Sequence, residues 1–172
     1  MVTSPSHPDS SSTHTIAQTN PSYSPQSGSA IIFRSGEETL IRPVSRVLSS
    51  LHRSDLLILS SQTPPLPSLP LSPYPARPDT PVRAHFVTDQ EPIDSGWSHG
   101  YMPGTYDALS HLLFTPPPTA GSSGGPIVDE ESGAVIGVML GTRVDNRVEG
   151  LRGSGVPSEV IFEMFSLPGI SK

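Results

Sequence analysis

The chain has 172 residues, of which 34% are hydrophobic and 15% charged, with 21 prolines, 15 glycines and no cysteine. This length fits one or two small packed units, and the absence of cysteine excludes disulfide bonds and a cysteine nucleophile. The net charge of −6 with scattered Lys and Arg argues against nucleic acid as a partner, and no apolar run is long enough to cross a membrane. We expect an all-β, intracellular, cytoplasmic protein, because glycine and proline interrupt helical patterns and no signal-peptide pattern is present.

Residues 1–28 consist mostly of Ser, Thr, Pro, Asn and Gln. A segment of this composition buries too little apolar surface to offset its ordering entropy, so we predict loop or disorder. The apolar run Ala30–Phe33, the turn residues Arg34–Glu38 and the stretch Leu40–Leu48 together predict a β-hairpin. The apolar segment Asp55–Leu59 predicts a further, buried strand.

Eight prolines lie between Pro64 and Pro81. Proline removes a ladder donor and fixes φ, so this stretch is excluded from a central strand or a helix interior. We interpret it as an extended connector and infer no partner from it. It divides the chain into a first part, residues 29–81, and a second part, residues 82–172.

The second part contains further strand patterns, of which Val82–Thr88 alternates and Leu109–Phe114 is apolar. The segments Pro126–Asp129 and Ala134–Gly141 flank a turn-forming stretch and predict a hairpin. Pro157–Phe165 predicts a helix, with proline at its first position and one apolar face. Three large side chains between Thr88 and Leu109 are assigned to the core, with a role as loop anchors as the alternative: Trp97, Tyr101 and Met102.

The run Gly121-Ser122-Ser123-Gly124-Gly125-Pro126 surrounds a serine with small residues. Glycines allow a tight turn that aims successive backbone N–H groups at one point. A serine nucleophile needs such donors for the oxyanion, and also a base for its proton. Ser123 is therefore the candidate nucleophile, with its own N–H and that of Gly121 as candidate oxyanion donors. A flexible glycine-serine linker is the alternative, which the apolar flank beginning at Pro126 disfavours.

This run resembles the Gly-Asp-Ser-Gly-Gly-Pro of trypsin-like serine peptidases and the Gly-Asn-Ser-Gly-Gly-Pro of HtrA proteases, with Ser122 in place of the acidic or amide residue. Residues 126–138 resemble the strand, hairpin and Val-Ile-Gly segment that follow the nucleophile in HtrA proteases. Gly153–Ser158 resembles the Gly-Phe-Ala-Ile-Pro-Ser stretch that opens their closing helix. The resemblance covers about Ser29 to Phe165. It implies a two-barrel trypsin-like peptidase fold with a C-terminal helix, a polypeptide substrate, and no metal or other cofactor.

The resemblance also implies a catalytic acid and base. Ser54–Leu59 resembles the Asp-Leu-Ala-Leu-Leu of the family, which makes Asp55 the expected buried acid that orients the base, although a turn cap is an alternative role. Val2–His7 resembles the family's Leu-Thr-Ala-Ala-His, so His7 is the expected base and His14 the alternative. The remaining histidines are poorly placed by family order: His52, His85, His99 and His111.

Family members place two or more strands ahead of the histidine, so we expect an incomplete first barrel. A catalytically inactive homologue that acts as a binding or scaffolding module is therefore the alternative function. Trypsin-type enzymes carry an aspartate six residues before the nucleophile, where this chain has Pro117. The expected pocket wall is the apolar strand with Val138, Leu140 and Gly141, which predicts cleavage after small or medium aliphatic residues.

Overall fold

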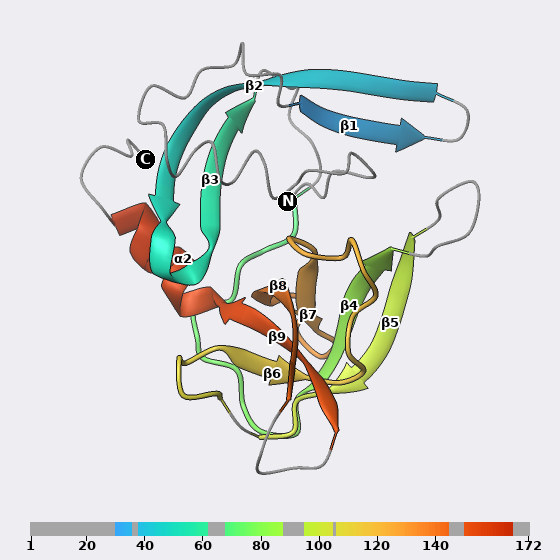
Figure 1. The fold of residues 1–172 in the computed structure, drawn as a ribbon, viewed down its shortest axis with the longest axis vertical. Helices are drawn as coiled ribbons and strands as arrows, with labels where there is room; N and C mark the ends of the chain where they lie inside the picture. The colour runs from blue at the N-terminus through green and yellow to red at the C-terminus, as the bar shows by residue number, and fades with distance from the viewer. Residues whose placement is uncertain are drawn as a thin grey trace. The chain divides into compact units, whose positions relative to one another are not determined.

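The computed structural model describes residues 30–35, 38–61, 68–87, 95–104, 106–144 and 150–166. The predicted loop 1–28, with His7 and His14, lies outside them. The described elements are mostly strands, as predicted (Figure 1). In chain order they are β1 (Ala30–Ser35), β2 (Glu38–Leu51), the 3-10 turn η2 (His52–Ser54), β3 (Leu56–Ser61), β4 (Pro81–Val87), β5 (Ser95–Tyr101), β6 (Leu112–Phe114), β7 (Pro126–Asp129), β8 (Val135–Val144), β9 (Leu151–Pro157) and α2 (Ser158–Ser166).

The chain divides into two compact units. The smaller unit contains a three-stranded sheet in the order β1-β2-β3. β1 and β2 pair antiparallel from Ala30 opposite Pro43 to Ser35 opposite Glu38, which confirms the predicted hairpin. β2 then pairs with β3 as far as Leu51 opposite Leu56, and two register shifts interrupt this ladder.

The larger unit, Ser68–Glu163, contains a six-stranded sheet in the order β5-β4-β7-β8-β9-β6. Its two outer strands meet, because Thr115, directly after β6, bridges Tyr101 at the end of β5. The Thr115 N–H donates to the Tyr101 carbonyl at 3.0 Å, and the Thr115 hydroxyl donates to the same oxygen at 3.3 Å. A Cβ on Gly100 would lie 1.7 Å from the Thr115 carbonyl oxygen, so this close approach requires glycine. The sheet thereby curls into a barrel.

Alternation along β4 defines the inside of this barrel. Val82, Ala84 and Phe86 are buried, whereas the residues between them are half-buried. The inward side chains form one apolar cluster: Val82, Ala84, Phe86, Met102, Leu112, Phe114, Ile127, Ile136 and Met139. Met102 was correctly assigned to the core. The same assignment is wrong for Trp97 and Tyr101, which are 40% and 49% exposed because they pair with outward-facing residues of β4.

The sequence patterns missed β5 and β9, which are rich in glycine and serine. In β9 the glycines permit close packing. A Cβ on Gly153 would meet the ring of Phe114 at 2.4 Å, and one on Gly155 would meet the Val138 carbonyl oxygen at 2.7 Å. β9 therefore forms because its neighbours require small residues, although its own composition disfavours a strand.

Three boundaries differ from the predictions. The predicted strand Leu109–Phe114 is shorter, because the Asp107 carboxylate captures the N–H groups of Leu109 and His111 in a turn and β6 begins only at Leu112. The helix begins at Ser158, since Pro157 still belongs to β9. The β7–β8 hairpin is confirmed, and β8 continues to Val144 because β9 pairs with it over this length.

Candidate active site

The loop Gly121–Pro126 enters β7 in a conformation that its glycines make possible. Gly121 and Gly124 have φ angles of 82° and 85°, in the left-handed region that favours glycine. The Gly124 N–H donates to the Met139 carbonyl at 2.8 Å, and the Met139 N–H donates to the Gly125 carbonyl at 2.9 Å. The loop is therefore an ordered structure fixed to β8, which excludes the flexible linker as an interpretation.

Ser122 is fully buried and holds the same loop to the end of β4. Its Oγ accepts the Val87 N–H at 2.9 Å and contacts Thr119 Oγ1 at 2.8 Å. The Thr119 hydroxyl donates its single proton to the Val87 carbonyl, so Ser122 supplies the proton in the contact between the two hydroxyls. The Ser122 proton is thus already engaged, and this serine has no access to a substrate.

Ser123, in contrast, is exposed, and its Oγ donates to the Leu140 carbonyl at 2.7 Å. This carbonyl lies at an irregularity of the β8–β9 ladder, where Met139 pairs with Gly155 and Gly141 with Ser154. Leu140 is the extra residue of a β-bulge, so its carbonyl can serve a partner outside the ladder. The structure therefore brings Ser123 to Leu140, one of the three predicted pocket residues, and Gly141 follows Leu140 in β8. Val138 is 4% exposed and directs its side chain into the protein.

The predicted oxyanion donors are close together in the loop. Within the part of the chain that the structure describes, neither the Gly121 N–H nor the Ser123 N–H donates to another protein group. An oxyanion that develops at a serine nucleophile needs N–H donors that no other group has taken.

The predicted acid and base lie elsewhere in the chain. Asp55 follows η2 in the smaller unit, has a φ angle of 52°, and is exposed where burial was expected. His7 and His14 lie outside the described residues. No histidine of the described ranges hydrogen-bonds to Ser123.

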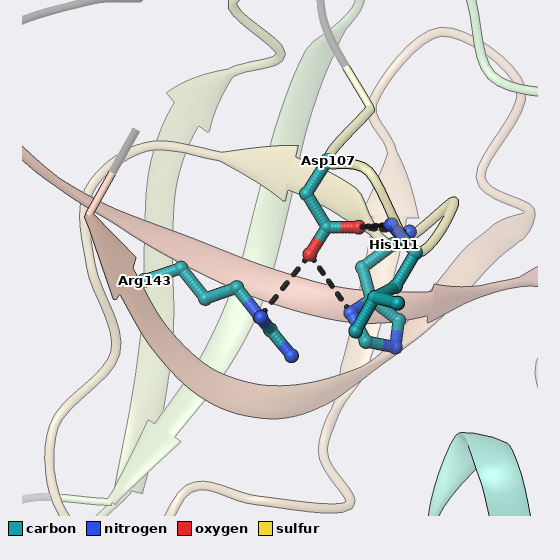
Figure 2. A network of polar contacts seen from close by, with 4 residues as sticks. Asp107, His111 and Arg143 are labelled. Carbon is teal, nitrogen blue, oxygen red and sulfur yellow. Dashed lines mark hydrogen bonds and ion pairs between the residues drawn. The ribbon is translucent and has the colours of Figure 1, made fainter. Parts of the chain in front are cut away.

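The barrel contains a histidine–carboxylate pair that the sequence patterns missed (Figure 2). His111 Nδ1 contacts Asp107 Oδ2 at 2.9 Å, and the Arg143 Nε contacts the same oxygen at 3.1 Å. Burial acts to raise the pKa of Asp107, and the hydrogen bonds from His111 and from the Leu109 N–H together outweigh it, so this pKa lies below its ordinary value. The cluster joins the turn before β6 to β8, and among the described residues no hydrogen bond or ion pair connects it to Ser123.

Comparison with known proteins bears on the fold of the chain. No family model and no curated protein sequence matches the chain. Solved structures do match its fold. The MamO protease domain from Magnetospirillum magneticum has a TM-score of 0.58 at 16% identity, over 78% of this chain and 73% of that one. The active form of the Rv3671c protease from M. tuberculosis has a TM-score of 0.58 at 18% identity, over 84% and 65% of the two chains.

A serine endoprotease from Yersinia pestis has a TM-score of 0.59 at 18% identity, over 80% of this chain and 47% of that one. The chain has the trypsin-like serine protease fold. Within this fold the six-stranded barrel of Ser68–Glu163 carries the serine loop. The smaller unit contributes three described strands.

The sequence patterns singled out the loop Gly121–Pro126 and missed the hydrogen bonds that support it. Thr119 and Ser122 were not recognised as a pair, although two hydroxyl residues three positions apart before a tight turn are a signal of side-chain to backbone bonding. The Asp107 turn could have been predicted, because an aspartate commonly accepts hydrogen bonds from backbone N–H groups a few residues later.

No described helix is long and apolar enough to span a membrane.

Proposed function

We propose that the chain is a serine endopeptidase with Ser123 as its nucleophile. In this reaction Ser123 Oγ attacks the carbonyl carbon of a peptide bond, a base takes the hydroxyl proton, and the N–H groups of Gly121 and Ser123 stabilise the oxyanion. The base returns the proton to the leaving amine, and water then hydrolyses the acyl-enzyme. His7 as base, Asp55 as its orienting acid and a relationship to HtrA proteases are the sequence-based part of the proposal.

The observation that carries this proposal is the difference between two adjacent serines. Ser122 is buried with its proton engaged, whereas Ser123 is exposed beside two unengaged N–H groups. Of these two serines, only Ser123 offers a hydroxyl to a substrate. Its bond to the Leu140 carbonyl defines a resting arrangement, which the base must replace before attack.

Labelling with a fluorophosphonate tests the proposal. We expect the parent protein to be labelled at Ser123 and Ser123→Ala to remain unlabelled. Ser132→Ala is the matched control, since Ser132 is an exposed serine in the β7–β8 turn. Labelling should also be lost in His7→Ala and Asp55→Ala. Labelling that persists in Ser123→Ala, or a folded parent that is never labelled, would contradict the assignment.

A non-catalytic binding module is the second candidate, favoured by the engagement of the Ser123 hydroxyl with Leu140 and by the absence of a histidine partner among the described residues. A folded protein that binds peptides without being labelled would support it. For the peptidase, the apolar strand at Leu140 and Gly141 supports cleavage after small or medium aliphatic residues. A peptide library tests this preference, and efficient cleavage only after arginine would refute it.

A further inference from the structure

Two hydroxyl groups join the nucleophile loop to the end of β4, and together they satisfy both backbone groups of one residue. Val87 is the last residue of β4 and pairs with Ser95 of β5. Its N–H donates to Ser122 Oγ at 2.9 Å, and its carbonyl accepts the Thr119 hydroxyl. The 2.8 Å contact between Thr119 and Ser122 completes a closed ring of hydrogen bonds.

We propose that Thr119 and Ser122 form a hydroxyl clamp that positions Ser123 and its oxyanion donors. The catalytic consequence rests on the proposed function, whereas the structural role does not. Neither residue touches the substrate in this assignment. They act through the backbone of the loop, so both are positioning residues.

The chemistry of the ring explains why both positions carry a hydroxyl. Each hydroxyl has one proton, and each proton has one destination: that of Thr119 goes to Val87 and that of Ser122 goes to Thr119. Because the donor order is fixed, the ring has a single arrangement. An apolar side chain at the buried Ser122 position would leave the half-buried Val87 N–H without its acceptor, and an N–H that loses its partner away from water costs free energy.

The loop needs this restraint because its other residues are conformationally permissive. Gly121 and Gly124 flank the two serines, and both adopt left-handed φ angles. Glycine reaches other φ values at little cost, so the local sequence alone does not fix the direction of the N–H groups. Ser122 lies between the two proposed oxyanion donors, and its backbone is also held by the Gly125 N–H donating to its carbonyl at 3.0 Å. Fixing the Ser122 side chain therefore also fixes the direction of the Gly121 and Ser123 N–H groups.

The test compares four variants of the full chain. Thr119→Val and Ser122→Ala each remove one hydroxyl of the clamp. Thr119→Ser keeps the hydroxyl at position 119 and removes only the methyl group. Thr115→Val is the matched control, because it removes a hydroxyl that bonds to the Tyr101 carbonyl at the barrel closure and leaves the loop untouched. The two readouts are the rate constant of fluorophosphonate labelling and the NMR shifts and hydrogen-exchange rates of the loop amides.

We expect Thr119→Val and Ser122→Ala to slow labelling by roughly tenfold to a hundredfold, the scale of a displaced oxyanion donor or nucleophile. Thr119→Ser should recover most of the rate. The amides of Gly121 and Ser123 should shift and exchange faster in the first two variants and not in Thr115→Val. Loop amides that do not move in Thr119→Val and Ser122→Ala would overturn the clamp, and so would a labelling rate equal to that of a labelled parent.

The two readouts separate this inference from the peptidase assignment. If the folded parent is never labelled, the proposed function fails, and the NMR readout alone decides the clamp. If the parent is labelled and the loop amides do not respond to loss of either hydroxyl, the clamp fails and the peptidase assignment stands.

Discussion

Replacing Gly153 by alanine tests how the barrel core is packed. Gly153 of β9 pairs directly with Phe114 of β6, a fully buried side chain of the apolar cluster. An alanine Cβ would lie 2.4 Å from Phe114 Cζ and 2.6 Å from both of its Cε atoms, whereas ordinary contacts begin at 3.4 Å. The ring therefore has to move by about 1 Å in a close-packed interior.

Overpacking of this kind costs typically about 1–3 kcal/mol, and we expect the upper end because three ring atoms clash at once. For a chain of this size each kcal/mol lowers the melting temperature by roughly 2–4 °C, so Gly153→Ala should melt roughly 6–12 °C below the parent. Circular dichroism measures this loss. Gly96→Ala is the control, since no atom lies within 4 Å of its added Cβ. Equal melting temperatures for the two variants would refute the packing argument.

Asp107→Asn should lower the free energy of unfolding by about 2 kcal/mol near neutral pH, because hydrogen bonds to a charged acceptor are weakened. The pKa of Asp107 is lower in the folded than in the unfolded state, so the stability difference between parent and variant has its full value above the unfolded pKa of about 4. The difference shrinks as pH falls through the folded pKa. Urea titrations at several pH values measure it. The Arg83 guanidinium lies 4.7 Å from the centre of the Trp97 ring, so a double-mutant cycle of Arg83→Ala and Trp97→Leu should give a coupling of about 0.5–1 kcal/mol, and zero would count against the contact. Gly125→Ala should abolish fluorophosphonate labelling of Ser123, because its Cβ would meet two backbone carbonyl oxygens at 2.9 and 3.0 Å, and unchanged labelling would show that the loop accommodates a methyl group.

Local signals were sufficient for several elements of this fold. The β7–β8 hairpin was predicted because its turn depends on neighbouring residues, with Gly133 at a φ angle of 70°. The hairpin of β1 and β2 was found for the same reason. The tight turn of the serine loop was predicted because it depends on Gly121 and Gly124 themselves. Both have positive φ angles, which glycine adopts without strain.

Other elements were missed because their causes lie far away in the sequence. β5 and β9 have compositions that disfavour strands, and they form only because β4 and β8 supply ladder partners. The exposure of Trp97 was misjudged because an aromatic residue indicates burial only when its face of the sheet is known, and pairing with His85 sets that face.

The sequence by itself determined the turns, the glycine positions and the all-β class, because these depend on φ preferences and on side-chain periodicity within a few residues. Only the tertiary structure decided that Ser122 is buried while the adjacent Ser123 is exposed. The Ser122 hydroxyl accepts a hydrogen bond from the Val87 N–H, which is 35 residues away in sequence. The Ser123 hydroxyl donates to the carbonyl of Leu140, 17 residues away. Contacts over such separations depend on strand order and register, which local propensities do not specify.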